Sequence, residues 1–353
     1  MRLRHLKYLA AYSIPTVVIV SMVLGGSYAF LAIGYVFVAV PFIELFTSGK
    51  TVNLSKLEEE VASKDKIYDF LLYALVPLHL FILIYFLLKV NQSEVIGFEL
   101  LGYITALGMS CGLSINNAHE LGHRTKKYEQ FLSQLLLMTS LYMHFFIEHN
   151  RGHHKNVATD EDPSSGRLGE SIYHFFPRTL IGSWKSAWHL EAVRCNNNSI
   201  PVVSVKNQML IFQIIQLLFL LLIFLIFGLK TMLAFTGSAC IGILMLETVN
   251  YIEHYGLSRK KKGSRYERTL PIHSWNSNHP IGRLIMLELS RHSDHHFMST
   301  RKYQILRHFD ESPQMPTGYP GMMLLALIPP IWFKVMNKEV ERFNILIHHK
   351  NNF

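Results

Sequence analysis

Cysteine and charge are both scarce in this chain of 353 residues. Its three cysteines, Cys111, Cys195 and Cys240, are far apart and form no C-x-x-C pair. This excludes a disulfide framework, a zinc ribbon and a cysteine-held iron site, and we expect no electron-transfer module of that kind to be fused to the chain. Only 17% of the residues are charged, whereas soluble domains have about a quarter. The chain is therefore not composed like a soluble domain.

The low content of charged residues is accompanied by long apolar runs. The run 208–229 has 22 residues without a charge, which is enough to cross a bilayer of about 30 Å at about 1.5 Å per helical residue. We predict an all-α integral membrane protein with six spans, at 8–27, 29–47, 67–89, 97–118, 207–228 and 231–252. The N-terminal run shows no small-x-small cleavage site, so we expect a retained span rather than a signal peptide. Two further runs are not counted as spans: 131–147 is expected to be a buried or re-entrant helix, and 321–335 an interfacial segment.

Basic residues indicate the orientation of these spans. Arg2, Arg4 and Lys7 precede the first span, and four lysines lie between the second and third, while the alternate loops are nearly bare. The positive-inside rule then places both termini in the cytoplasm. Residues 1–118 hold spans one to four, 119–206 a cytoplasmic segment, 207–252 spans five and six, and 253–353 a second cytoplasmic segment. The net charge of +9 fits such loops, and because no basic stretch carries a stacking platform, we expect no nucleic-acid partner.

Nine of the 19 histidines fall into four tight groups, all predicted at the cytoplasmic ends of spans. The groups are 119-HELGH-123, 149-HNRGHH-154, 250-NYIEHYGL-257 and 292-HSDHH-296. On a helix, spacings of three and four residues place imidazoles on one face, where they can share an ion. The nine candidates are His119, His123, His149, His153, His154, His254, His292, His295 and His296.

The first group also fits the H-E-x-x-H pattern of zinc peptidases, in which the glutamate acts as the base. One catalytic zinc needs three protein ligands and an open position, and nine clustered histidines exceed that number. Nine nitrogens suit two metal ions with four or five imidazoles each, and such sites are compatible with iron chemistry, although zinc and copper also accept imidazole. The isolated histidines, among them His79, His144 and His273, are expected to be ordinary structural residues, and His279 is left outside the ligand set.

Carboxylates beside these groups have two interpretations. Glu120, Glu148, Glu253 and Asp294 can hold the second ring nitrogen of a ligating histidine and so fix its orientation. Any of them can instead bind or bridge the metals. We expect the orienting role for most of them.

Together, HELGH, EHNRGHH, NYIEHYGL and LSRHSDHH resemble the integral-membrane non-haem diiron alkane 1-monooxygenases, within the fatty acid desaturase/hydroxylase superfamily. The segments 156-NVATDEDPSSGRLGES-171, 274-SWNSNH-279 and RHFDESPQ are also similar. The histidine pattern is shared with fatty-acyl desaturases, sterol oxidases and carotenoid hydroxylases. The NYIEHYGL group, with Asn250 and Glu253 in place, and the SWNSN and RHFDESPQ segments separate this family from them.

The resemblance implies six spans in the bacterial inner membrane, capped by a cytoplasmic site in which the nine histidines hold two iron ions. It further implies dioxygen as co-substrate and terminal hydroxylation of medium- to long-chain alkanes. Electrons would come from rubredoxin, reduced by an NAD(P)H-dependent rubredoxin reductase. Alternatives are hydroxylation of other alkyl groups, as in xylene monooxygenases, and lipid desaturation. Metal transport would place ionisable residues midway along the spans, whereas these histidines lie at span ends.

Overall fold

The computed structural model describes residues 4–350, side chains up to residue 347, and is predominantly helical. The first elements are η1 (Arg4–Tyr12), α1 (Ser13–Leu24), η2 (Gly26–Phe30), α2 (Leu31–Gly34), η3 (Tyr35–Ala39), α3 (Val40–Glu44), α4 (Lys56–Lys64), α5 (Lys66–Val90), α6 (Gly97–Gly122), α7 (Lys127–Met138), α8 (Phe145–Glu148), η4 (His149–His153) and α9 (His154–Asn156). The remaining elements are α10 (Ile172–Asn197), α11 (Gln208–His254), β1 (Lys261–Lys262), β2 (Arg265–Tyr266), η5 (Pro271–His273), α12 (Pro280–Ile285), α13 (His292–Phe297), η6 (Tyr303–Ile305), α14 (Tyr319–Ala326) and α15 (Pro329–Lys350).

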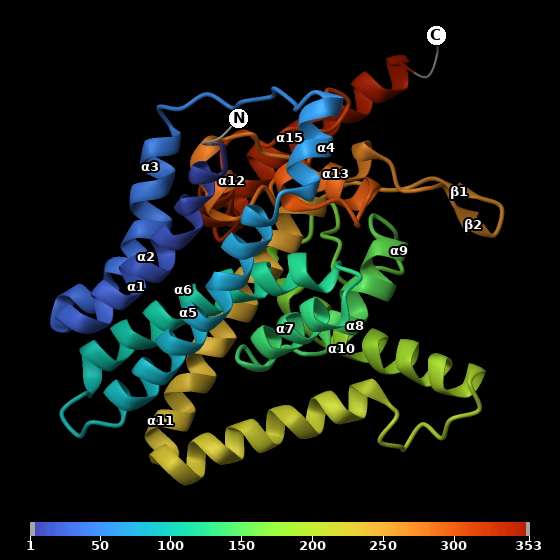
Figure 1. The fold of residues 1–353 in the computed structure, drawn as a ribbon. Coiled ribbons are helices and arrows are strands. Elements are labelled where there is room, and N and C mark those ends of the chain that lie inside the picture. Colours follow the sequence, from blue (N-terminus) through green and yellow to red (C-terminus); the bar gives the residue numbers. More distant parts are fainter. Residues whose placement is uncertain (1–3, 351–353) are drawn as a thin grey trace.

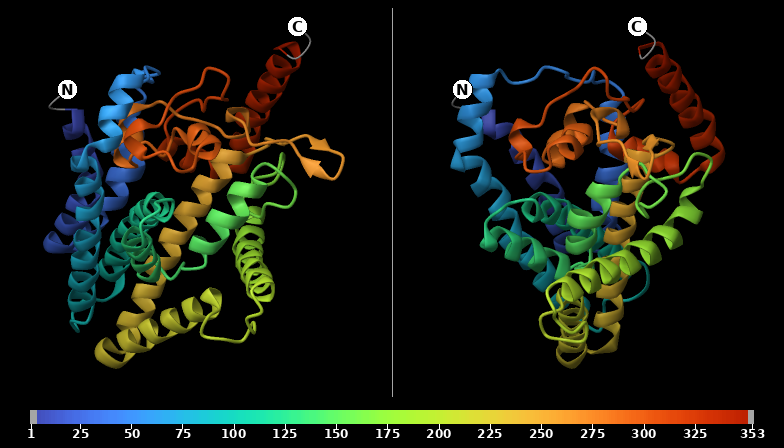
Figure 2. Two further views of the ribbon diagram at one scale, coloured as in Figure 1. Left: turned by 45° about the vertical axis from the view of Figure 1, so that its right-hand side comes forward. Right: turned by 90° about the vertical axis from the view of Figure 1, so that its right-hand side faces the viewer.

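The long apolar helices form one bundle, and the shorter elements cover one end of it (Figures 1 and 2). Among the described residues, five helical segments are long and apolar enough to cross a membrane: Arg4–Leu24, Gly26–Glu44, Lys66–Val90, Gly97–Gly122 and Gln208–His254. The first four correspond to the first four predicted spans, with shifts of a few residues at their ends. Their buried faces pack against one another, as with Val18, Phe86 and Leu107. Figure 2 shows α12, α13 and the connecting loops above this bundle.

The last two predicted spans, 207–228 and 231–252, correspond to the two helices of α11 on either side of Gly228, but no loop separates them. Gly228 interrupts α11 with φ 75° and ψ 177°, a backbone conformation that suits glycine because it has no Cβ. The two halves of α11 therefore run in different directions from Gly228 (Figure 1). Apolar composition predicts the two helices and their lengths, but not that they meet directly at Gly228.

The run 131–147 is likewise not the single buried or re-entrant helix that was expected. Helix α7 ends at Met138, and the chain turns at Leu141, which has a positive φ of 54°, before α8 begins at Phe145. Both pieces are buried on one side: Leu136 and Leu137 of α7 and Phe145 of α8 belong to one hydrophobic cluster. The turn separates a helix that packs on α6 from the segment that leads directly into the second histidine group.

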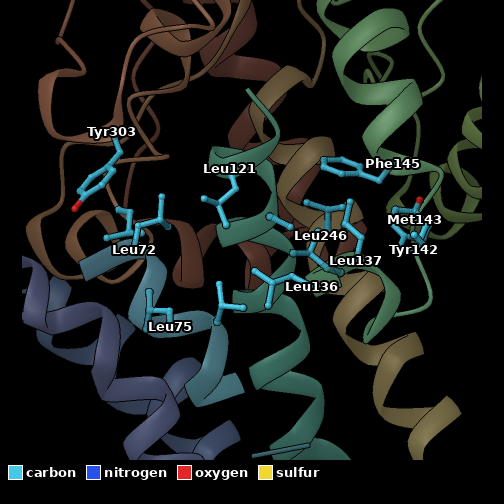
Figure 3. Packing of buried hydrophobic residues seen from close by; sticks show 14 of the residues in the cluster. Leu72, Leu75, Leu121, Leu136, Leu137, Tyr142, Met143, Phe145, Leu246 and Tyr303 are labelled. Atoms are coloured by element: carbon cyan, nitrogen blue, oxygen red, sulfur yellow. The ribbon is translucent and has the colours of Figure 1, made fainter. Parts of the chain in front are cut away.

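The hydrophobic cluster that contains Leu136, Leu137 and Phe145 also holds the histidine-bearing end of α6 in place. Leu121 of α6 is fully buried among side chains from α5, α7 and the loop before η6. Figure 3 shows these residues gathered around α6, from Leu72 and Tyr303 on one side to Leu137 and Phe145 on the other. Tyr303 also donates a hydrogen bond of 2.9 Å to the carbonyl oxygen of Tyr68 in α5. Apolar packing therefore joins the C-terminal segment to the bundle beside the first histidine group.

Candidate metal centre

The structure brings all nine candidate histidines together at the capped end of the bundle. They form two adjacent groups, and within each group the candidate ligand atoms lie within 4.8 Å of one another. The larger group consists of His119, His123, His149, His154 and His295, and the smaller of His153, His254, His292 and His296. The rings of His154 and His296, one from each group, stack with centroids 4.4 Å apart. The two groups are therefore in direct contact through stacked imidazole rings.

Local helix geometry explains how neighbouring histidines serve different groups. His119 and His123 are four residues apart at the end of α6 and stay together. The second motif lies in η4, a π-helical turn that is wider than an α-helical turn and is often found at functional sites. There His149 and His154 belong to the larger group while His153 belongs to the smaller. In α13, the adjacent residues His295 and His296 also belong to different groups, His295 to the larger and His296 to the smaller.

The nitrogens that face one another are the Nε2 atoms, at the spacing of a metal coordination sphere. Nε2 of His119 lies 2.9 Å from that of His295, and Nε2 of His149 lies 3.0 Å from that of His123. In the smaller group the corresponding separation between His292 and His254 is 3.2 Å. A metal–nitrogen distance of about 2.1 Å and right angles between ligands give about 3.0 Å between neighbouring nitrogens. Each group can therefore hold a metal ion without rearrangement.

Electrostatics around the groups favour neutral imidazoles, the form that binds metals. Burial lowers the pKa of His123 to about 3, with nearby positive charge at His153 and Arg124 adding to the effect. Burial and neighbouring imidazoles lower the pKa values of His295 and His296 in the same way. Unprotonated Nε2 lone pairs directed at one another inside the protein are costly unless a cation lies between them. The donor set thus fits a metal ion chemically as well as geometrically.

His153 differs because a carboxylate holds its other nitrogen. Asp162, fully buried in the loop after α9, lies 2.9 Å from His153 Nδ1 through its Oδ2 atom. Burial opposes protonation of His153, but the charge of Asp162 outweighs it and raises the pKa of His153. Ser165 and the backbone N–H of Ser164 donate hydrogen bonds to the same carboxylate, at 2.5 and 3.1 Å. The arrangement holds Nε2 of His153 toward the metal position.

Asp162 is the functional candidate that the sequence argument missed. It lies in the segment 156–171, whose resemblance to the family does not distinguish any single residue. His273, expected to be an ordinary structural residue, also contributes, since its carbonyl oxygen lies 3.4 Å from Nδ1 of His254. Neither contact has a sequence signal beyond proximity to a motif, because each depends on how a loop returns to the site.

Glu253 is the predicted carboxylate that lies closest to a candidate ligand nitrogen. Its Oε2 atom is 3.1 Å from Nε2 of His292, the nitrogen that faces His254. Tyr319 of α14 donates a hydrogen bond of 2.8 Å to the other oxygen. Because Glu253 faces Nε2 rather than Nδ1, its carboxylate lies on the metal side of the ring. Glu253 therefore lies where a ligand or a bridging group would lie, rather than behind its histidine.

The other predicted carboxylates contact different partners among the described residues. Glu120 accepts hydrogen bonds from Arg124, at 2.6 Å, and from the backbone N–H of Tyr303. Asp294 accepts one from the backbone N–H of Arg307, at 2.7 Å. Both carboxylates thereby connect a histidine-bearing helix to the loops around η6. They brace helices α6 and α13 rather than orienting individual imidazoles.

Glu148 and Asn250 lie beside the smaller group without contacting an imidazole by hydrogen bond. Burial and the nearby charge of Asp162 raise the pKa of Glu148 to about 8, and Ser186 of α10 is its hydrogen-bond donor, at 3.4 Å. Asn250 donates a hydrogen bond of 3.3 Å to Glu247, one turn earlier in α11. Both residues therefore belong to a buried polar layer behind the histidines.

An apolar cavity lies inside the bundle, close to the larger histidine group. It is lined by α1, α3, α6, α11, α12 and α14, with Met109, Met245 and Met323 among its wall residues. Asn116 and Met286 also line a second, smaller cavity, which His119 and His295 border on its other side. Asn116 and Met286 therefore lie between the apolar cavity and the larger histidine group.

Comparison with known proteins places the fold and site in a family. The family model for fatty acid desaturase matches residues 98–325. An alkane 1-monooxygenase of Acinetobacter baylyi is 40% identical over 306 residues, which cover 86% of this chain and 74% of the relative. Alkane 1-monooxygenase 2 of Pseudomonas aeruginosa is 39% identical over 324 residues, 90% of this chain and 85% of the relative. The hydroxylase component XylM of the xylene/toluene monooxygenase of Pseudomonas putida is 28% identical over 261 residues, 71% of this chain and 66% of the relative.

The chain therefore belongs to the fatty acid desaturase family, in the branch that contains the alkane 1-monooxygenases, which confirms the resemblance seen in the histidine motifs. It is a multi-pass membrane enzyme with histidine clusters that can bind metal.

Proposed function

We propose that this chain hydroxylates the terminal methyl group of medium- to long-chain alkanes, with dioxygen as co-substrate. The reaction consumes one alkane, one dioxygen, two electrons and two protons, and yields one primary alcohol and one water. The observation that carries the proposal is the apolar cavity beside the five-histidine group, in a chain about 40% identical to proteins named alkane 1-monooxygenase. An alkane partitions into lipid, so a cavity within membrane-spanning helices meets it where it is concentrated.

In this proposal the nine histidines hold two iron ions, five imidazoles on one and four on the other. Bound iron supplies the activation of dioxygen. The protein positions the substrate: a C–H bond offers neither charge nor lone pair, so selectivity comes from the shape of an apolar wall. Met109, Met245 and Met323 form such a wall, and Asn116 lies where it meets the histidines. Asp162 keeps His153 oriented, and the surrounding buried layer excludes water.

The proposed topology has six spans in the bacterial inner membrane, with both halves of α11 counted separately on either side of Gly228. Residues 119–206 and 253–353 then lie on the cytoplasmic side with the histidines, and so do both termini. Rubredoxin, reduced by an NAD(P)H-dependent reductase, supplies the electrons from the cytoplasm. The density of basic residues before the first span and between the second and third supports this orientation.

Product analysis tests the proposal. Membranes of a host that expresses the chain, supplied with rubredoxin, its reductase and NADH, are incubated with octane, dodecane or hexadecane. We expect primary alcohols, detected by gas chromatography, and oxygen from labelled dioxygen in the product. The matched control is His149→Ala, which removes one imidazole of the larger group. An alkene without added oxygen would instead identify a desaturase, and absence of any product from these alkanes would contradict the proposal.

A second substrate class follows from the similarity to XylM, which is named as a xylene/toluene monooxygenase component. Methyl groups on aromatic rings also present terminal C–H bonds. Incubation with xylene in the same assay distinguishes the two. Turnover of xylene faster than that of every alkane would favour this second candidate.

A further inference from the structure

A basic hairpin projects from the protein beside the smaller histidine group. Six of the ten residues from 259 to 268 are Lys or Arg, and one is acidic. Strands β1 and β2 are two residues long and pair antiparallel around a turn at Gly263, which has a φ of 63°. Figures 1 and 2 show the hairpin extending away from the rest of the molecule. We call residues 259–268 the basic hairpin.

The charges on this hairpin are not neutralised by the chain itself. Lys260, Lys261, Lys262, Arg265 and Arg268 are exposed, and none of them forms an ion pair with another described residue. Lys262 lies directly opposite Arg265 in the strand pairing. Like charges opposite one another destabilise a sheet. Ion pairing within the hairpin therefore does not account for the two facing cations at its tip.

The base of the hairpin is tied to the candidate metal centre at two points. The guanidinium of Arg259 donates a hydrogen bond of 2.8 Å to the carbonyl oxygen of Lys155, the residue after His154. On the other strand, Glu267 lies 3.4 Å from Nε2 of His273, whose carbonyl oxygen lies beside His254. A molecule that binds the hairpin therefore lies next to both histidine groups.

His154 is also one of the two candidate ligands that are partly exposed; the other is His123. Lys155 beside it is exposed and adds one more positive charge at the base of the hairpin. An electron that enters from outside has its shortest protein path where a ligand approaches the surface. Positive charge around that point raises the local concentration of a negatively charged partner.

On these grounds, and resting on the proposed function, we propose that the basic hairpin is the docking site of an acidic electron-donor protein. Each docking oxidises one reduced donor by one electron, and two dockings supply the two electrons that the hydroxylation consumes. The alternative occupant is an anionic lipid surface. A polybasic segment can bind anionic lipid by charge alone, but a lipid contact gives no reason for the hairpin base to contact Lys155 and His273 beside the candidate ligands. The observations therefore favour a protein.

The test reverses charge at the hairpin tip and at a matched position. In the variant K262E/R265E, the two facing side chains keep a like-charge pair but change sign. The control K334E/K338E makes the same total change on two exposed lysines four residues apart in α15. Each protein is placed in nanodiscs of zwitterionic lipid, and alkane turnover is measured against the concentration of an acidic rubredoxin, at low and high salt.

We expect K262E/R265E to raise the rubredoxin concentration for half-maximal turnover by about tenfold at low salt, because surface charge acts on association. High salt should reduce the difference, and turnover at saturating rubredoxin or with dithionite should equal that of the unmodified chain. The control should match the unmodified chain throughout. Equal rubredoxin dependence of all three proteins would overturn the docking site. The measurement is repeated in nanodiscs that contain phosphatidylglycerol, and an effect of K262E/R265E confined to these would also overturn the docking site and would instead identify a lipid contact.

Direct binding of rubredoxin to the immobilised nanodiscs, without alkane, separates this inference from the proposed function. If dithionite drives no alkane hydroxylation in the unmodified chain, the proposed function fails, whatever the binding result. If hydroxylation occurs but the hairpin variant binds rubredoxin as tightly as the control, only the docking site fails.

Discussion

Replacing Asp162 by asparagine tests whether a buried carboxylate orients His153. Both carboxylate oxygens act as acceptors: Oδ2 accepts from His153 Nδ1 and Ser165, and Oδ1 accepts from the N–H of Ser164. An asparagine has only one oxygen, so its NH₂ group must face one of these donors. If it faces His153, the ring is driven to the tautomer with its proton on Nε2, which cannot bind metal. If it faces Ser164, the loop loses a hydrogen bond and places two N–H groups together.

The expected loss of metal affinity follows from replacing a hydrogen bond to a charged carboxylate by one between neutral groups. A hydrogen bond to a charged group contributes about 1.5–3 kcal/mol and one between neutral groups about 0.5–1.5 kcal/mol. The difference of about 1–2 kcal/mol corresponds to roughly tenfold weaker metal binding, at the lower end of the 10–100-fold range for partners of metal-ligating histidines. Because His153 belongs to the four-histidine group, we expect only one of the two iron ions to be released more easily.

The assay is a chelator titration of purified protein, with the iron that remains per chain measured by elemental analysis. Asp162→Asn should lose its first iron at about tenfold lower chelator concentration and its second at the normal concentration. Asp160→Asn is the control, since Asp160 is exposed in the same loop and the substitution changes the charge equally. A release curve of Asp162→Asn that coincides with that of Asp160→Asn would refute the orienting role.

Three other substitutions test the metal centre, the packing and the cavity. His295→Ala should abolish terminal alcohol formation while membrane insertion stays intact, as measured by gas chromatography and membrane fractionation; retained turnover with normal iron content would remove His295 from the ligands. Leu121→Ala should lower the free energy of unfolding by about 2–5 kcal/mol, because the side chain is fully buried, and denaturant titration in detergent measures this. Gly112→Leu places a side chain in the cavity against Met245, whose Sδ atom lies 3.0 Å from the position of an added Cβ. Each methylene that no longer fits should cost about 1–3 kcal/mol, so competition between alkanes should shift toward shorter chains, and an unchanged preference would contradict the role of this cavity.

The histidine positions could be predicted because their signal is local. Spacings such as His119 to His123 follow from one helical turn, and the apolar runs before them predict where the helices end. The assignment of each histidine to the group of five or to the group of four could not be predicted, because it depends on the π-helical turn at His149–His153 and on the separation of His295 from His296. A π-helical turn adds one residue to a turn without a sequence pattern of its own.

Features that depend on contacts between distant segments of the chain could not be predicted either, because they have no local sequence pattern. Asp162 has acidic neighbours, Asp160 and Glu161, and nothing in the sequence distinguishes the buried carboxylate from the exposed ones. The turn at Leu141 and the interruption at Gly228 are backbone conformations selected by packing, not by composition. Sequence predicted which segments are apolar, and the structure adds how they are divided.

The position of the histidines at helix ends resolves a conflict between burial and access. Imidazoles that bind metal need neighbours that exclude water, yet Asn116 and Met286 connect them to an apolar cavity and the basic hairpin connects them to the aqueous side. A site at mid-bundle would meet the alkane but not a protein donor. A site on the outer surface would meet the donor but not the alkane. The larger group contains both candidate ligands that are partly exposed, His123 and His154, and it also lines the second cavity through His119 and His295. In the proposed function, substrate and electrons therefore both reach the five-histidine group, the substrate from the apolar side and the electrons from the aqueous side.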